Sequence, residues 1–395
     1  MNGKFQFQKV GQGCFYTGEI GYKYHKPFVM VYDCGSVTKG TYLNDAIDDF
    51  KRDIDKIDLL IISHLHKDHF SGIKRLMQGM YVKTIILPYL PLIKRLALIG
   101  SDNSYDQDTV DFLRDPHAYF RSFGSEIGQI VFIEPDSIKK NDNNLNRGNN
   151  DSNSEKQTDF DSLQFQEDSD FKQRALEDDP RLDNYEEVSF LPYNSRFTLG
   201  NSIWEFLFYH RETKKLTDLS DFESAIRNYM RMHSLNLVDM FEDKHRSVLQ
   251  DFYKTHINKN LNYTSICLYH GPMVNKRFYL YRGRNFYDFL NRDKSGTILT
   301  GDQFLKTKID FNFFCDYFQN KLEKTGIFQV PHHGSAANWN PMSNRLNTAN
   351  IPYYAINHGF GRAKHPSRNV LNNINAHARN SLLFNNEFYY IRYYI

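Results

Sequence analysis

The chain has 395 residues, of which 40% are hydrophobic and 15% aromatic, and its formal net charge is +2. This content is enough for a substantial core, whereas no run approaches the roughly 20 apolar residues that span a membrane. The first residues lack the apolar core of a signal peptide, and the four cysteines are widely separated without C-x-x-C spacing. We therefore expect a cytoplasmic protein with reduced thiols.

The first predicted elements are three strands, at residues 5–10, 14–19 and 28–32. The third strand ends at the run Asp33-Cys34-Gly35-Ser36. An amphipathic helix is predicted over 42–54, because apolar residues recur there at helical spacing with acidic residues between them.

The strongest functional signal follows the apolar run 58–62, which we interpret as a short buried strand. The next seven residues place four potential metal ligands within six positions, and helical spacing then resumes. The ligands are His64, His66, Asp68 and His69. Histidines two apart on extended backbone point the same way, while an Asp-His pair at the helix start can face a second ion. Imidazole and carboxylate suit zinc, manganese or iron. The alternative is a histidine-rich surface turn.

The chain then alternates strands with helices. We predict strands at 82–87 and 129–133, with helices at 91–98 and 108–123 between them. This alternation favours a layered α/β fold.

An acidic segment interrupts this pattern at 136–187, where Asn, Asp, Ser, Glu and Gln dominate. From Glu134 to Glu187 there are 16 acidic and 7 basic residues, which leaves about +11 on the rest of the chain. That balance favours an anionic, phosphate-bearing substrate. Such a polar segment cannot bury enough apolar surface to fold, so we expect a disordered, flexible insertion. The alternative is a partner-binding arm or a nucleic-acid mimic.

Strands are predicted again at 188–191 and 203–208, followed by a helical cap insertion over 211–258. Its two expected helices span 220–232 and 234–253, and its histidines are interpreted as surface or packing residues. Paired strands are then expected at 264–269 and 277–281.

The last part of the chain repeats the arrangement of a strand that ends in polar residues. The strand at 297–300 ends at Gly301-Asp302, and the strand at 327–330 leads to the adjacent His332 and His333. Adjacent residues point to opposite sides of an extended backbone. One histidine can therefore bind metal while the other faces substrate. A strand at 351–357 precedes His365, and the aromatic run 384–395 is expected to be a terminal strand, with base stacking as the alternative.

These motifs, in this order, resemble the metallo-β-lactamase superfamily. The set looks most like the hydrolase domain at the C-terminus of the DNA-internalisation competence protein ComEC and its free-standing relatives. The similarity covers about residues 5–100 and 195–395. It implies an αββα sandwich, here a single catalytic domain over 1–395 that carries the acidic and helical insertions. The runs that carry the resemblance are 10–13, 32–36, 63–69, 262–266, 298–302, 330–335 and 365–366.

The resemblance also implies a site for two divalent metal ions, with zinc expected and manganese the alternative. The implied metal ligands are His64, His66, Asp68, His69, Asp302 and His332. Asp302 would bridge the two ions, and Asp33 would orient a ligand histidine. Asp68, His333 and His365 are the expected catalytic residues, with His365 as leaving-group acid or phosphate ligand.

Three points of the resemblance stay open. No motif marks a third histidine for the first metal, for which His270 is a candidate. Relatives often carry an acidic residue where this chain has Cys14. Arg362 and Lys364 are expected anion contacts, or else solvated loop residues.

The implied function is metal-dependent hydrolysis of a phosphodiester, by a nuclease or phosphodiesterase that acts on nucleic acid or a similar substrate. One alternative is hydrolysis of a small cyclic nucleotide, thioester or lactone, because fold does not fix substrate. Another is a non-catalytic subunit, although the intact ligand set argues against it. A protein partner or a homo-oligomer is also left open.

Overall fold

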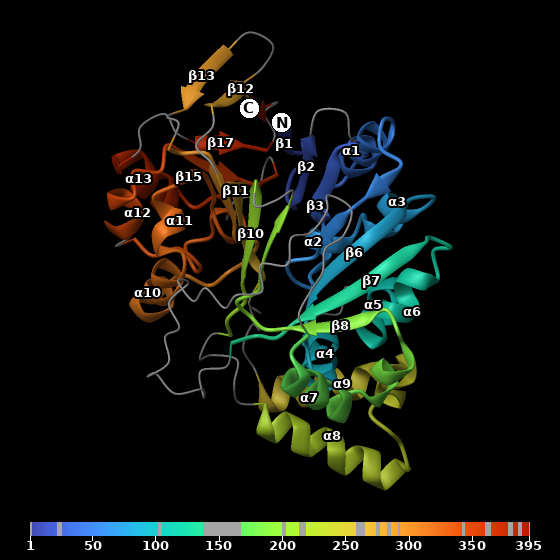
Figure 1. Ribbon diagram of the computed structural model, residues 1–395. Helices are drawn as coiled ribbons and strands as arrows, with labels where there is room; N and C mark the ends of the chain where they lie inside the picture. The colour runs from blue at the N-terminus through green and yellow to red at the C-terminus, as the bar shows by residue number, and fades with distance from the viewer. Residues whose placement is uncertain are drawn as a thin grey trace.

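The protein is built in layers, with two β-sheets face to face and helices over both outer faces (Figure 1). The structure is a computed structural model, and it describes residues 2–21, 26–101, 105–136, 167–199, 203–212, 219–257, 265–273, 277–282, 286–290, 293–341, 344–359, 365–377, 382–385 and 389–394. Within these ranges the predicted αββα sandwich is confirmed.

The first sheet has the strand order β13-β12-β18-β1-β2-β3-β5-β6-β7-β8, with β4 paired to β6. From β3 to β8 neighbouring strands are parallel, so their carboxyl ends meet at one edge. The strands are β1 (Asn2–Phe7), β2 (Phe15–Gly21), β3 (Phe28–Cys34), β4 (Lys56–Ile57), β5 (Leu59–Ile61), β6 (Tyr81–Pro88), β7 (Ile127–Ile133), β8 (Val188–Leu191), β12 (Arg277–Arg282), β13 (Phe286–Leu290) and β18 (Tyr389–Tyr394).

The second sheet has the order β17-β16-β15-β14-β11-β10-β9. Strands β14 to β17 are parallel, so the residues that follow them also gather at one edge. The strands are β9 (Arg196–Leu199), β10 (Trp204–Tyr209), β11 (Cys267–Pro272), β14 (Gly296–Leu299), β15 (Thr325–Gln329), β16 (Tyr353–Ile356) and β17 (Leu382–Phe384).

An apolar core fills the space between the two sheets. Phe5 stacks on Trp204 with ring centroids 5.3 Å apart, which joins β1 of the first sheet to β10 of the second. The predicted terminal strand is confirmed as β18, which pairs with β1 so that the ends of the chain lie close together (Figure 1).

Helices cover the outer faces, with α10 to α13 on one side in Figure 1 and α1, α3, α5 and α6 on the other. The helices are α1 (Tyr42–Lys51), α2 (Lys67–Phe70), α3 (Ile73–Met77), α4 (Leu92–Ser101), α5 (Gln107–Arg114), α6 (Pro116–Arg121), α7 (Ser169–Asp178), α8 (Ser220–His233), α9 (Arg246–His256), α10 (Lys308–Tyr317), α11 (Gln319–Leu322), α12 (Asn344–Thr348) and α13 (Arg368–His377). No helix in the described ranges is long and apolar enough to cross a membrane.

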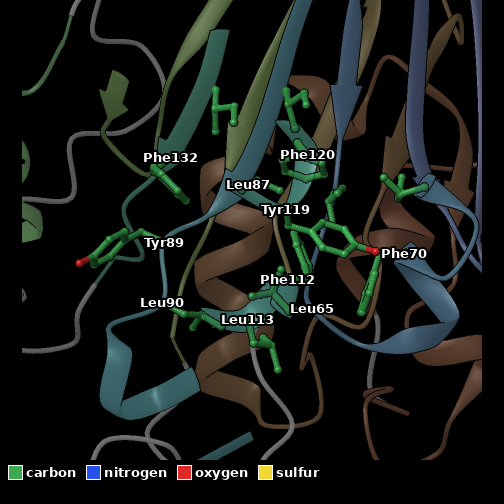
Figure 2. Close-up of a cluster of buried hydrophobic side chains, with 14 of the residues drawn as sticks. Leu65, Phe70, Leu87, Tyr89, Leu90, Phe112, Leu113, Tyr119, Phe120 and Phe132 are labelled. Atoms are coloured by element: carbon green, nitrogen blue, oxygen red, sulfur yellow. The ribbon is translucent and has the colours of Figure 1, made fainter. Parts of the chain in front are cut away.

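The second core lies between the first sheet and its helices, and it anchors the turn that carries the predicted ligands. Leu65 and Phe70 point into this core, where Phe70 packs against Phe112 of α5 at 4.8 Å between centroids (Figure 2). The two buried apolar side chains therefore fix the turn from both ends.

The acidic segment corrects one expectation. Residues 137–166 lie outside the described ranges, but much of 167–187, also expected to be disordered, is helical: α7 is followed by the 3-10 helix η1 (Pro180–Asn184). The physical reason is local: Asp168 caps α7 by accepting from the Phe171 N–H, and Phe171 and Ala175 are buried. Composition averaged over the segment hid this short amphipathic helix.

The predicted helical insertion is present as α8, two 3-10 turns η3 (Asp239–Phe241) and η4 (Asp243–His245), and α9. The expected second helix therefore starts later than predicted, because α8 ends at Ser234 in the left-handed conformation. Helix α9 packs on α4 so closely that a Cβ at Gly100 would lie 2.7 Å from the Leu249 carbonyl oxygen.

Candidate metal centre

The predicted ligands converge at the edge where the two sheets end together. His64, His66, Asp68 and His69 follow β5, whereas Asp302 follows β14 and His332 and His333 follow β15. The two sheets are joined here by the Ile266 N–H, which donates to the Ser63 carbonyl oxygen at 2.8 Å, and by the Tyr32 hydroxyl, which donates to the Ile266 carbonyl oxygen at 2.7 Å. Each sheet thus supplies one half of the site.

Asp33 organises the half from the first sheet. It is fully buried at the end of β3 with a φ of +59°. Its Oδ1 accepts from the Ser63 N–H at 2.6 Å, and its Oδ2 accepts from the Ser63 hydroxyl at 2.7 Å and from His69 Nδ1 at 2.7 Å. Because a carboxylate only accepts, the proton of His69 must sit on Nδ1, which leaves Nε2 to act as a ligand.

His64 is oriented in the same way, by two serine hydroxyls. Its Nδ1 lies 3.1 Å from Ser63 Oγ and 3.2 Å from Ser265 Oγ. The Ser63 hydroxyl hydrogen is committed to Asp33, so Ser63 Oγ accepts from His64 Nδ1 and the lone pair again lies on Nε2. Ser265 Oγ also accepts the Asp302 N–H at 2.8 Å, which couples this histidine to the opposite sheet.

The Asp302 carboxylate lies between two sets of imidazoles. Its Oδ2 is 3.5 Å from Nε2 of both His64 and His332, and its Oδ1 is 3.3 Å from Nε2 of His69 and 3.9 Å from Nε2 of His333. One oxygen therefore faces each set. The resemblance implies a bridging carboxylate at this position, and a carboxylate placed in this way could serve two ions at once.

Three atoms of this cluster are buried without a hydrogen-bond partner among the described residues: His64 Nε2, His69 Nε2 and Asp302 Oδ1. Buried polar atoms are normally paired, so this concentration requires an explanation. Imidazole nitrogens and carboxylate oxygens within 4.8 Å of one another form a donor set for a divalent cation. The groups that meet this limit around Asp302 are His64 with His66, and His69 with His333. The residues present therefore fit the expected metal ions.

Asp68 pairs with His333 across the site. Asp68 Oδ2 lies 2.8 Å from His333 Nε2, and His333 Nδ1 donates to the Asn357 carbonyl oxygen at 2.6 Å. His332 points to the other oxygen of Asp302, and its Nδ1 lies 2.9 Å from Asn338 Oδ1. Both histidines thus face the cluster. The geometry offers His333 as a ligand beside His69 and places His332 on the His64 side.

Burial and charge set the protonation of these groups. Burial opposes charge on Asp302, but His332, His64 and His69 outweigh it and hold its pKa well below the usual range. Burial also opposes charge on His69, but the carboxylates of Asp33, Asp68 and Asp302 outweigh it and raise its pKa. Burial and the neighbouring His64 lower the pKa of His66 to about 4. The carboxylates and imidazoles of the cluster thus stabilise each other's charges. Bound cations would replace the imidazole charges in compensating the carboxylates.

The remaining candidates fall in different places. His365 stacks on His332 with centroids 5.5 Å apart, at the rim of the cluster. Burial, with His332 and His333, lowers its pKa to about 4, so near pH 7 it is a neutral imidazole with one N–H to donate. Arg362 and Lys364 lie outside the described residues. His270 is in the core between the sheets, where its Nε2 lies 3.0 Å from the Tyr16 hydroxyl, and it joins none of the candidate metal groups.

Sequence reasoning named Asp33 but missed the other residues that orient the ligands. Ser63 and Ser265 lie within runs that carried the resemblance, but their hydroxyls were given no role. Asn338 and Asn357 follow no pattern that marks them, because their contacts arise only when β14, β15 and β16 end at one edge.

Comparison with known proteins finds a family match over one region of the chain. Residues 25–135 match the model of the metallo-beta-lactamase superfamily, a stretch that includes Asp33 and the turn from His64 to His69. No curated protein matches the chain. Among solved structures it is similar to the crystal structure of a long form RNase Z from yeast, with 10% identity and a TM-score of 0.32. That match covers 99% of this chain and 41% of the other. The finer resemblance to ComEC stays a prediction.

Proposed function

We propose that the protein is a metal-dependent hydrolase that cleaves phosphodiester bonds, with nucleic acid as the expected substrate. The observation that carries the proposal is the Asp302 carboxylate, which presents one oxygen to His64 and His332 and the other to His69 and His333. A pair of divalent ions, with zinc expected and manganese the alternative, suits this donor set.

Bound ions would supply Lewis acidity, which makes water nucleophilic near neutral pH and neutralises charge on phosphate oxygens. The protein's own residues prepare the site for this. Asp33 and Ser63 hold the Nε2 atoms of His69 and His64 toward Asp302, so no reorientation is needed when ions bind.

Asp68, His333 and His365 are proposed to act on the substrate side. Asp68 accepts a hydrogen bond from His333 Nε2 at 2.8 Å, so with His333 outside the ligand set this pair would hold a proton beside the attacking water. His365 is neutral near pH 7 and can donate its N–H to a phosphate or leaving-group oxygen. Its lowered pKa favours the role of phosphate ligand over that of a fully protonated acid.

Charge and redox state agree with this assignment. The chain outside residues 134–187 carries about +11, which would attract a polyanion. The four cysteines are free and buried, consistent with the cytoplasmic location that we propose.

Two other functions compete. A hydrolase of a small cyclic nucleotide, thioester or lactone would use the same centre, whereas a non-catalytic binding subunit would not need the buried unpaired ligand atoms. Those atoms favour catalysis over binding alone. A protein partner or a homo-oligomer is compatible with either enzyme.

The test is metal analysis of purified protein with a panel of single-stranded DNA, duplex DNA, RNA and bis(p-nitrophenyl) phosphate. We expect about two ions per chain and cleavage of the synthetic diester and at least one nucleic acid. His64→Ala should lose turnover by orders of magnitude, while the matched variant His256→Ala, at an exposed histidine of α9, should keep it. A protein that binds no metal, or a fully active His64→Ala variant, would refute the proposal. Cleavage of the small ester alone would favour the small-molecule hydrolase.

A further inference from the structure

Two buried side chains that the proposed mechanism does not use connect the halves of the metal centre. Gln329 is the last residue of β15 in the second sheet, and Cys14 precedes β2 in the first. Their exposed fractions are 3% and 0%. Gln329 Nε2 donates to Cys14 Sγ at 3.3 Å, so the contact crosses from one sheet to the other.

On the second sheet, Gln329 fixes the turn that carries Asp302. Its Oε1 accepts from the Thr300 N–H at 2.8 Å and from the Gly301 N–H at 3.0 Å. The Thr300 hydroxyl in turn donates a hydrogen bond to the Gln329 carbonyl oxygen at 2.9 Å. Only the oxygen of a carboxamide can accept from two N–H groups, so its NH₂ must face Cys14.

This turn has little freedom to move. Gly301 has a φ of +51°, and a Cβ there would lie 2.7 Å from Ser63 Oγ and 2.8 Å from Ser265 Oγ. The backbone of Gly301 is therefore pressed against the two hydroxyls that orient His64. A small displacement of the turn would move the Asp302 carboxylate relative to both sets of histidines.

On the first sheet, Cys14 lies against the pair that orients His69. Its Sγ is within 4.8 Å of a carboxylate oxygen of Asp33 and a ring nitrogen of His69. Its N–H donates to the Asp68 carbonyl oxygen at 3.1 Å, and its carbonyl oxygen accepts from the Gly35 N–H at 2.9 Å. The side chain and backbone of Cys14 thus lie beside three residues of the half of the site that the first sheet supplies: Asp33, Asp68 and His69.

We propose that the hydrogen bond between Gln329 and Cys14 links the two sheets and positions the Asp302 carboxylate opposite the Asp33–His69 pair. This link sets how tightly an ion beside His69 would be held. Both are positioning residues: Gln329 binds Thr300, Gly301 and Cys14, and Cys14 Sγ lies near the Asp33 carboxylate that orients His69. The inference rests on the proposed metal centre and adds the determinant of its affinity.

The experiment compares zinc affinities of Cys14→Ala, Gln329→Met and the double variant, measured by competition with a chromophoric chelator. Each single variant should bind the ion beside His69 about 10- to 100-fold less tightly, the range for residues that orient ligands. Because the two side chains act through one contact, the double variant should bind no more weakly than the weaker single variant. Cys14→Ser keeps a donor and an acceptor and should recover most of the affinity.

The matched control is Thr325→Val. Thr325 begins the strand that Gln329 ends, and its buried hydroxyl donates to the Lys321 carbonyl oxygen at 2.7 Å, away from the metal centre. This variant should lose stability without loss of ion affinity. If Gln329→Met does not fold, the comparison of Cys14→Ala with Cys14→Ser still decides.

The proposed link would be refuted if the losses of zinc affinity in the two single variants multiplied in the double variant, or if neither single variant changed the affinity. Either result would leave the proposed metal centre intact. A wild-type protein that binds no zinc or manganese would instead refute the proposed function, and the inference with it.

Discussion

At the scale of single residues, the metal centre depends on which ring nitrogen carries the proton. His69 and His64 each direct Nδ1 to an acceptor, Asp33 for His69 and Ser63 for His64, and each turns Nε2 toward Asp302. Without bound ions these atoms are buried and unpaired, which costs free energy. A bound cation would therefore stabilise this arrangement by pairing these atoms.

A variant at Asp302 tests whether the site binds one ion or two. Asp302→Asn keeps the size of the side chain but removes the charge that lies between the two sets of imidazoles. We expect the content of about two ions to fall to about one, because two cations close together would lose their shared compensation. Turnover of a simple phosphodiester should fall by several orders of magnitude.

The measurement is plasma mass spectrometry of wild type and Asp302→Asn, with turnover in parallel. Circular dichroism provides the control that the fold is retained. Unchanged ion content together with unchanged turnover would show that Asp302 is only a turn residue and that the two-ion mechanism is wrong.

At the scale of elements, the acidic segment divides into parts with different physical roles. Its carboxyl-terminal part is attached to the body of the protein through α7. Asp178 accepts from the Tyr89 hydroxyl at 2.8 Å and from the Leu92 N–H at 3.0 Å, and Asp179 lies 3.8 Å from the buried Arg95. Helix α7 therefore helps to fix the start of α4.

Two deletions should separate these roles. Replacing residues 139–165 by a flexible Gly/Ser linker of about 12 residues should leave turnover of a small phosphodiester nearly unchanged, because that polar stretch lacks the apolar content of a core. Extending the deletion to residue 177 removes the buried Phe171 as well. That loss should cost at least about 3–5 kcal/mol, as for a buried phenylalanine truncated to alanine.

Chemical denaturation of the two deletion proteins gives the comparison. Equal stability of both would mean that burial of Phe171 in α7 does not stabilise the fold. A loss of activity in the shorter deletion alone would assign the polar stretch a role in the reaction.

At the scale of the whole molecule, local patterns predicted the layered α/β fold and the family resemblance supplied most candidate ligands, but neither predicted the contacts between sheets. The turn from His64 to His69 was found because its candidate ligands are neighbours in the chain, whereas Asp302 was named as a ligand only through the resemblance. Which way His332 and His333 face depends on the turn after β15, and no alternation rule could decide it. Ser265 and Gln329 gain their roles only when the two sheets meet, so a single-sequence pattern carries no sign of them.

The same geometry would make bound ions part of the stability of the fold. His64 and His69 come from the first sheet, whereas Asp302, His332 and His333 come from the second. Ions bound between them favour the folded state alone, which adds about 4.1 kcal/mol per site when the free ion is at 1,000 times its Kd. For a chain of 395 residues this corresponds to roughly 5 °C in Tm.

Chelation should therefore lower the Tm of the wild-type protein, and added zinc should restore it. His64→Ala, which lacks one ligand, should melt with a smaller difference between the chelated and zinc-loaded states. The exposed-histidine variant His256→Ala should show the full difference, which separates loss of the centre from a general effect of removing a histidine. Differential scanning calorimetry at matched protein concentration makes the comparison. If the Tm is the same with and without chelator, the two sheets do not hold ions between them, whereas an undiminished shift in His64→Ala would locate the bound ions elsewhere.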